Sequence, residues 1–362
     1  MSSRPRVLFA STETFEAGDQ LAACLRRHKV RVELFRPPAH GVFAKALRLV
    51  SSLVYQHVDQ SLTDESDGPD LTGLTAALAA PGTIAVQATD QTLEPLVATL
   101  ADRPQMVRRV CDAPEPQGMV DKRWQVRVAQ EAGLSVPRVW LDPAAVDIFP
   151  VLIKPILGGG GAGIRPAADA QELAEQWRVA EAEGGPHFVQ QRVHGRTMHV
   201  GGVAKQGVPV VIAAYEGDGP AEFGQISSGR LLPDPAAVSA ARQFLGAAGY
   251  TGIFCFDFIR TESGEHYFLE VNPRIFGSWM TLQLGGVDLV TGYLYALGLS
   301  EPPPSPSPDY TTTWELKHPT DASTGQVLRA GVARVRTMRP FIGWRGSAVM
   351  LVDLVAHVRR TR

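Results

Sequence analysis

The 362-residue sequence predicts an α/β protein with a strand-rich α+β part in its middle and a small C-terminal extension. Three observations predict this class. Short apolar runs alternate with amphipathic helical patterns over the first hundred residues. Runs rich in branched and aromatic residues follow one another between residues 150 and 271. A proline-rich stretch at residues 302–308 then separates this middle part from an arginine-rich end.

The first hundred residues contain two strand–helix units. Strands are predicted at residues 7–10, 30–35 and 83–86, and helices at residues 16–28, 71–80 and 91–100. Such alternation is typical of a small parallel sheet with helices on its faces. The turn at residues 11–14 lacks the glycines of a dinucleotide fingerprint, so this unit predicts no cofactor site.

The middle of the chain contains more strands than helices. Helices are predicted at residues 120–132, 169–183, 234–248 and 287–297, and strands at residues 151–154, 187–191, 198–204, 208–214, 254–259 and 266–271. Gly133 and Gly249 follow the first and third of these helices, where a glycine commonly ends a helix.

The last two predicted strands carry acidic residues among aromatic ones. A turn-prone segment at residues 262–265 joins them, so a hairpin would place Asp257 across from Glu270. Glu270 and Asn272 share one face because side chains alternate along a strand. Carboxylates flanked by so many apolar residues usually have a partner. Oxygen ligands of this kind suit Mg²⁺ held together with phosphates, and Arg274 keeps the same face if the strand continues.

A cation and a flexible loop lie together earlier in the chain. Lys154 ends a predicted strand, and the run from Gly158 to Gly163 follows it with five glycines in six residues. Backbone amides of such a loop can approach phosphates that a Cβ atom would block, and Lys154 would neutralise phosphate charge. The order is not that of a P-loop, because the lysine precedes the glycines. A plain flexible connection is the alternative.

Taken in order, these segments resemble the ATP-grasp superfamily, in the branch related to the ATP-binding modules of carbamoyl-phosphate synthetase. The resemblance covers roughly residues 117–299 and is carried by an Asp-Lys helix start, Ile-Lys-Pro with its glycine loop, an adenine hinge, an Asp on a strand and Glu-Val-Asn-Pro-Arg. It implies a Rossmann-like pre-ATP-grasp domain at residues 1–115 and an ATP-grasp domain at residues 116–300. The ATP-grasp domain would comprise a lid (about 120–192) and a larger catalytic subdomain (about 193–300). Composition adds a proline-rich linker at residues 301–309 and a basic extension at residues 310–362.

The resemblance also implies roles for single residues, with ATP and Mg²⁺, or Mn²⁺, as cofactors. Lys122 and Lys154 would bind the phosphates, under a mobile loop of Gly159, Gly160 and Gly161, and adenine would contact Gln190 and the backbone of Gln191 to Val193. The metal would bind Asp257, Glu270 and Asn272. The catalytic residues would be Arg274 and Lys154. Two positions depart from the family pattern: Gln190 replaces a usual Glu, and Thr197 replaces an acid that often binds the ribose.

The implied activity is that of a carboxylate–amine ligase that forms an amide through an acyl phosphate and releases ADP and phosphate. Its substrates would be small carboxylates and amines, such as amino acids or a specialised metabolite. Two alternatives stay open: an ATP-grasp enzyme acting on bicarbonate or another small acid, and a non-catalytic ATP-binding regulatory or scaffold protein. Substrate contacts are expected in the loop from Tyr215 to Arg230 and after Arg274, with Ser228, Arg230, Ser278 and Trp279 as candidates.

Composition and charge indicate the cellular compartment and the partners that this protein is expected to have. Hydrophobic residues make up 44% and charged residues 20%, as in soluble globular proteins. No apolar run approaches the roughly 20 residues that span a bilayer. The three cysteines form no metal or disulfide pattern, which is typical of a reducing compartment. A cytoplasmic protein is therefore predicted. Residues 329–362 contain eight arginines and one acidic residue, a net charge of +7. The rest of the chain therefore carries −9, which argues against a nucleic-acid partner for the body of the protein. The basic tail either packs on the body or in a homodimer, or contacts acidic lipid or an acidic carrier.

Overall fold

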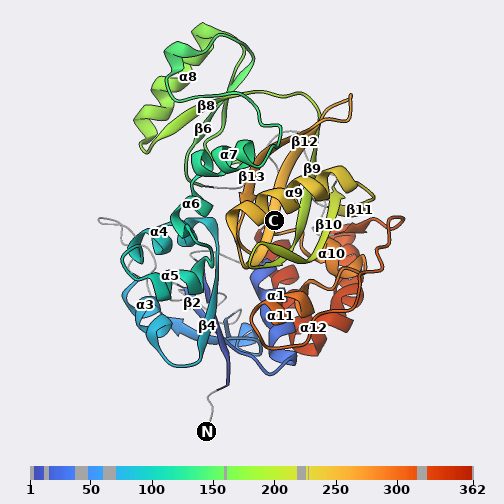
Figure 1. Ribbon diagram of the computed structural model, residues 1–362. Coiled ribbons are helices and arrows are strands. Elements are labelled where there is room, and N and C mark those ends of the chain that lie inside the picture. The colour runs from blue at the N-terminus through green and yellow to red at the C-terminus, as the bar shows by residue number, and fades with distance from the viewer. Residues whose placement is uncertain are drawn as a thin grey trace.

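The computed structural model describes residues 4–11, 16–36, 48–59, 71–158, 161–217, 226, 228–315 and 324–360. Its first unit is a four-stranded parallel sheet in the order β3-β2-β1-β4, with helices on both faces (Figure 1). The elements of this unit are β1 (Arg6–Ala10), α1 (Glu16–Arg27), β2 (Arg31–Arg36), β3 (Gln56–Asp59), α3 (Thr72–Ala79), β4 (Thr83–Ala88), α4 (Asp90–Thr99) and α5 (Pro104–Val110). The predicted parallel α/β unit is confirmed, and β3 and α5 are additions that the sequence patterns did not indicate.

A small antiparallel sheet in the order β5-β8-β6-β7 follows, at the top of Figure 1. The elements here are α6 (Pro116–Val120), α7 (Lys122–Glu131), β5 (Val139–Trp140), the 3₁₀ turn η1 (Pro143–Ala145), β6 (Val151–Pro155), β7 (Arg165–Ala167), α8 (Ala170–Glu183) and β8 (His187–Gln191). Alternate residues of the strands, among them Ile153 and Val189, pack under Leu173 of α8. The opposite face of the small sheet is therefore free to line a site.

The large sheet has the order β13-β12-β9-β10-β11-β14 and is antiparallel throughout. Its strands and the helices around it are β9 (Arg196–Lys205), β10 (Val208–Glu216), β11 (Ser228–Leu232), α9 (Pro235–Ala248), β12 (Gly252–Arg260), β13 (His266–Asn272), α10 (Met280–Leu284), α11 (Leu289–Ala296) and β14 (Trp314–Glu315). Phe256 and Phe268 pack on Phe244 of α9, and Phe258 packs on both of them, which accounts for the aromatic side of the hairpin. The carboxylates of the hairpin lie on the other side.

Strands β10 and β11 correct the prediction of a loop between Tyr215 and Arg230. The segment from Tyr215 to Arg230 was expected to be a loop, but its ends belong to β10 and β11, which pair Glu216 with Arg230. The polar composition of the intervening residues obscured the short second strand. Ser227 and the residues between 218 and 225 lie outside the described part of the chain.

The basic C-terminal segment forms the long helix α12 (Thr324–Arg360), which is broken at Gly343, where φ is +66°. Its apolar residues Val335, Met338 and Ile342 are buried in a core that it shares with α1 and the large sheet. Arg334 lies 2.9 Å from Glu16 at the start of α1. Of the two interpretations of the tail, packing on the body is the one observed. Within the described residues, no helix is both long enough and apolar enough to cross a bilayer.

Candidate active site

The hairpin of β12 and β13 brings the predicted metal ligands together. Asp257 lies opposite Glu270 in the register, as the sequence predicted, and the Nδ2 atom of Asn272 is 3.4 Å from an Asp257 oxygen. A β-bulge follows Asp257 and keeps Phe258 and Phe268 paired on the aromatic side. Strand β13 ends at Asn272, so Arg274 comes from the segment beyond it.

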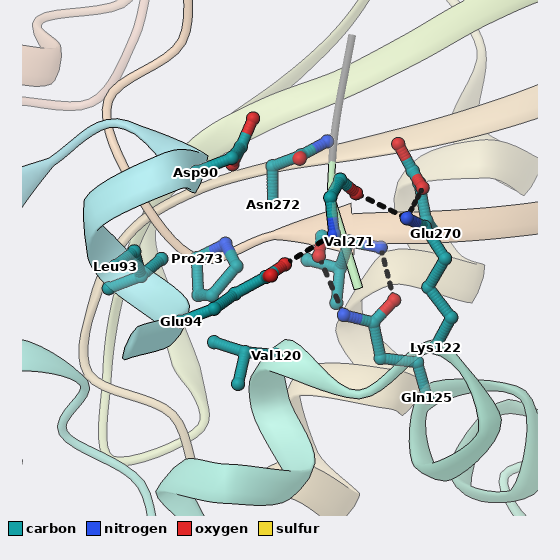
Figure 2. A pocket seen from close by; sticks show the side chains of 11 residues that line it. Asp90, Leu93, Glu94, Val120, Lys122, Gln125, Glu270, Val271, Asn272 and Pro273 are labelled. Atoms are coloured by element: carbon teal, nitrogen blue, oxygen red, sulfur yellow. Dashed lines mark hydrogen bonds and ion pairs between the residues drawn. The ribbon is translucent and has the colours of Figure 1, made fainter. Parts of the chain in front are cut away.

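Lys122 reaches this hairpin from the first turn of α7 (Figure 2). Its Nζ atom lies 3.5 Å from a carboxylate oxygen of Glu270 and also donates to the carbonyl of Gly158. The position of Lys122 is fixed because Asp121 caps α7 by accepting from two backbone N–H groups. Burial raises the pKa of Glu270, and the charge of Lys122 opposes that shift. Lys122 thus joins the glycine loop to the acidic hairpin.

Gln125, one turn further along α7, covers the edge of the large sheet. Its Nε2 atom donates to the carbonyl of Val271 over 2.9 Å, and its Oε1 atom accepts from the N–H of Val271 over 3.0 Å. β13 is an edge strand, so these backbone groups have no strand partner on that side. Gln125 therefore satisfies both groups and fixes the strand segment that carries Glu270 and Asn272. No local pattern in the sequence indicates this contact, because it joins residues 146 positions apart.

Lys154 lies on the face of the small sheet that looks away from α8. The residue is 6% exposed, and burial lowers the pKa of its ammonium group to about 8, against the opposing effect of Glu270 and the further influence of Lys122 and Asp257. Lys154 is therefore close enough to Glu270 and Asp257 of the hairpin for their charges to interact.

The glycine loop begins beside helix α4. Gly158 has φ of +106°, a conformation that favours glycine, and its N–H donates to Glu94 over 2.6 Å. Gly161 also has a positive φ of +79°. Gly159 and Gly160 lie outside the described residues. Burial raises the pKa of Glu94, whose carboxylate, visible in Figure 2, belongs to the N-terminal unit.

Arg274 is also held by the N-terminal unit. Its Nε and Nη2 atoms donate to the two carboxylate oxygens of Asp90, and its Nη1 atom donates to the carbonyl of Ile275 over 2.9 Å. Gln87 accepts from the N–H of Ile275 over 3.0 Å. Gln87 and Asp90 flank the carboxyl end of the parallel strand β4, which is where α/β sheets commonly place ligand-binding residues. That general rule is the signal by which the sequence could have indicated both residues.

A second group that sequence reasoning missed surrounds Asp257. His199 on β9 lies opposite Asp257, and its Nδ1 atom is 2.7 Å from a carboxylate oxygen. The imidazole stacks on Tyr215, with ring centroids 5.0 Å apart, and the Tyr215 hydroxyl contacts Ser278 at 2.7 Å and Cys255 at 3.2 Å. Period-2 alternation along β9 was the available signal, but it does not identify the neighbouring strand.

The predicted adenine hinge begins with the last two residues of β8. Gln190 is 1% exposed and lies opposite Leu152, on the same face of the small sheet as Lys154. The N–H groups of Gln191 and Arg192 donate to carbonyls of Arg138 and Pro150, at 2.8 and 3.0 Å. Both N–H groups are therefore engaged within the chain. The N–H of Val193 makes no backbone hydrogen bond with any described residue. Thr197 lies on β9 and is exposed.

The candidate substrate residues do not form one group. The Trp279 side chain is fully buried in the core, so it offers no accessible contact, and Ser278 is bound to Tyr215. Arg230 is 45% exposed and pairs with Glu216 at 2.5 Å, next to Ser228 on β11. Of these candidates, Ser278 is the one connected to the Asp257 network.

The donor set of the hairpin fits Mg²⁺. Asp257 and Glu270 face each other across neighbouring strands, and Asn272 lies on the same side, with its amide nitrogen toward Asp257 and its amide oxygen toward Arg274. Their side chains remain 23% and 19% exposed for the two acids, so a cation bound there would keep water ligands. Hard oxygen donors with room for water and phosphate oxygens are what Mg²⁺ requires.

Comparison with known proteins agrees with this geometry. Residues 119–278 match the family model of the ATP-grasp domain. The sequence is 27% identical to biotin carboxylase from Nostoc sp. over 210 residues, which are 54% of this chain and 47% of that protein. This part of the chain, residues 119–278, is therefore a domain of the ATP-grasp superfamily. It spans at most about half the length of such curated relatives.

Two solved structures share the fold over most of the chain. Carboxyaminoimidazole ribonucleotide synthase from Aspergillus clavatus, complexed with ATP, superposes with a TM-score of 0.66 at 13% identity, covering 91% of this chain and 87% of that one. L-amino acid ligase from Bacillus licheniformis superposes with a TM-score of 0.60 at 15% identity, covering 85% and 78%. The expected order of a parallel N-terminal sheet and two antiparallel sheets is thereby confirmed.

Proposed function

We propose that this protein is a carboxylate–amine ligase that forms an amide bond through an acyl phosphate and releases ADP and phosphate. The observation that carries the proposal is the convergence of three cations and two carboxylates between the sheets. Lys122 contacts Glu270, and Lys154 faces the hairpin from the small sheet. Arg274 enters beside Asn272, with its Nη2 atom 3.4 Å from the Asn272 oxygen. Phosphoryl transfer needs such positioning and charge neutralisation more than covalent help.

In this proposal the nucleotide lies with its phosphates between the two sheets. Lys122 and Lys154 bind phosphate oxygens, and the backbone around Gly158 and Gly161 closes over them. Asp257, Glu270 and Asn272 hold Mg²⁺, which supplies charge neutralisation on the phosphates when bound. Lys122 now contacts Glu270 and the Gly158 carbonyl, so nucleotide binding replaces these internal contacts with contacts to phosphate.

Arg274 acts on the carboxylate substrate. A planar guanidinium can bind two oxygens at once, so it suits both a carboxylate and the oxygens of an acyl phosphate. Its Nη1 and Nη2 atoms lie next to Ile275 and Asn272, and Asp90 fixes the plane of the group. The carboxylate oxygen attacks the γ-phosphorus, ADP leaves, and an amine then displaces phosphate from the acyl carbon. The closed glycine loop excludes water, which would otherwise hydrolyse the acyl phosphate.

A second candidate function is activation of bicarbonate or a comparable small acid. The observation that favours it is the similarity to biotin carboxylase across 54% of the chain. Both functions share the nucleotide site and differ in the acid that Arg274 receives. The third hypothesis is a non-catalytic ATP-binding protein, which would bind nucleotide without releasing phosphate.

Transfer of ¹⁸O separates these functions. The full-length protein is incubated with ATP, Mg²⁺ and an amino-acid pool labelled with ¹⁸O in the carboxylates, and the released phosphate is analysed by mass spectrometry. A ligase of the proposed kind transfers one carboxylate oxygen to phosphate and forms an amide product. Label that arrives in phosphate from ¹⁸O-bicarbonate alone favours the second candidate. ADP binding with no phosphate release from any labelled acid overturns the ligase proposal.

A further inference from the structure

Gln190 carries a buried side-chain N–H donor that has no partner in the described part of the chain. The residue is 1% exposed, and its Nε2 atom has no hydrogen-bond acceptor among the residues that the structure describes. A buried N–H donor left unpaired is costly, and such groups in folded proteins are nearly always satisfied. The donor is therefore available to an acceptor on a bound ligand.

The place of Gln190 in the small sheet limits what that acceptor is. Gln190 pairs with Leu152 in the register, and Lys154 lies two residues beyond Leu152 on the same face. Two residues of strand and one strand spacing separate the two side chains by on the order of 8 Å. If Lys154 binds phosphates, as the proposed function requires, Gln190 lies where a base would be. The face is the one opposite α8, which is turned toward the hairpin.

We propose that Gln190 binds the Hoogsteen edge of adenine with both ends of its amide. Its Oε1 atom accepts from the 6-amino group, and its Nε2 atom donates to N7. Adenine offers this donor and acceptor side by side, and a glutamine amide matches them in a bidentate pair. A carboxylate at this position would accept from the amino group but would have no proton for N7. Gln190 therefore donates a hydrogen bond to N7 of adenine, which an ionised Glu at this position could not do.

The same pairing selects against guanine. Guanine presents O6 and N7, both acceptors, on this edge. One end of the Gln190 amide would then meet an acceptor with its own oxygen. The neighbouring N–H groups of Gln191 and Arg192 are bound to Arg138 and Pro150 and do not offer a replacement donor. At this edge of the base, the Gln190 amide therefore distinguishes the two purines.

Binding of nucleotide analogues tests the proposal without knowledge of the acid or the amine. Calorimetry with Mg²⁺ compares ADP with 7-deaza-ADP, which keeps the amino group and replaces N7 by C–H. The full-length wild-type protein is expected to bind 7-deaza-ADP about tenfold more weakly, as for loss of one hydrogen bond to a buried donor. Equal affinities would mean that water or another group satisfies Nε2, and would overturn the proposal.

Two variants sharpen the comparison. Gln190→Met, which keeps the length of the side chain, and Gln190→Glu are each expected to bind ADP and 7-deaza-ADP with affinities within twofold of each other. The control ligand is 2′-deoxy-ADP, whose altered ribose must carry the same penalty in wild type and in Gln190→Met. Discrimination against 7-deaza-ADP that persists in Gln190→Met would assign the N7 contact to another residue. Absence of any ADP binding would instead refute the nucleotide site of the proposed function, and this inference with it.

Discussion

Asp90 and Arg274 form a bidentate ion pair between the N-terminal unit and the segment that follows β13. Nε and Nη2 of the guanidinium each donate to a different oxygen of the carboxylate, and the two residues are 184 positions apart in the chain. Their side chains are 23% and 16% exposed, so the pair is largely withdrawn from water. This geometry fixes the plane of the guanidinium. The N-terminal unit thereby orients the cation that the proposed mechanism places at the reaction centre.

Asp90→Asn is expected to lower the free energy of unfolding by about 1–3 kcal/mol, because it leaves a largely buried guanidinium without its counter-charge. Urea unfolding followed by circular dichroism measures the change. The matched control is Glu131→Gln, which breaks an exposed ion pair with Arg127 and should cost no more than about 0.5 kcal/mol. An Asp90→Asn effect as small as the control would show that the ion pair contributes nothing to stability.

Arg274→Lys is expected to reduce phosphate release about 100-fold or more, while the affinity for ADP changes by less than about threefold. A lysine keeps the charge but cannot make two parallel hydrogen bonds to a carboxylate, and loss of such a contact to developing charge typically has this size. Steady-state phosphate release and ADP calorimetry provide the two readings. Weakened ADP binding at an unchanged rate would place Arg274 on the nucleotide instead of the acid.

The local parts of this site were predictable because they depend on spacing along the chain. Period-2 alternation and a short turn sufficed to place Asp257 opposite Glu270, and the register has them paired. Lys154 at the end of a strand before glycines was predictable for the same reason. In contrast, Asp90 reaches Arg274 only because two sheets pack together, and no local pattern carries that information.

Longer-range contacts also explain which substrate candidates changed. Trp279 follows the Arg274 motif, where the sequence predicts a substrate contact, but tertiary packing buries its side chain completely. His199 gave no signal of its own, since its importance comes from the pairing of β9 with β12. Arg230 was expected in a loop, and pairing with Glu216 makes it part of a strand. In each case tertiary packing decided what the local sequence left open.

Glu270→Gln is expected to abolish phosphate release and to remove the Mg²⁺-dependent part of ADP stabilisation. The neutral amide keeps the shape of the side chain but weakens the donor set for a divalent cation and the contact with Lys122, now 3.5 Å away. Thermal unfolding with ADP, with and without Mg²⁺, measures the second effect. Glu265→Gln, in the turn of the same hairpin, is the control and should behave as wild type. Full activity in Glu270→Gln would refute the assignment of this residue to the metal.

The affinity for ADP is expected to fall as pH rises through about 8. Burial lowers the pKa of Lys154 to about 8 from its ordinary value of 10.5, so the free protein carries this charge below pH 8 and loses it above. Phosphates favour the charged form, and binding above pH 8 must therefore take up a proton, which weakens affinity by up to about tenfold per pH unit. Lys154→Arg, whose charge persists, should remove this dependence between pH 7 and 9.5. Calorimetry over that range decides, and an equally steep decline in the variant would assign the titration to another group.

The docking of α12 on α1 can be tested with two glycines that both lie in helices. A Cβ atom at Gly346 would come within 2.8 Å of the Cβ of Ala23 on α1 and 2.7 Å of the Cβ of Ile342, whereas one at Gly246 of α9 would meet nothing within 4 Å. Alanine should therefore stabilise the protein at position 246 by about 0.5–1 kcal/mol, through its higher helix propensity. At position 346 the same propensity gain is opposed by overpacking of about 1–3 kcal/mol. Urea unfolding is expected to separate Gly346→Ala from Gly246→Ala by that amount, and equal effects would mean that α12 does not pack against α1 at this point.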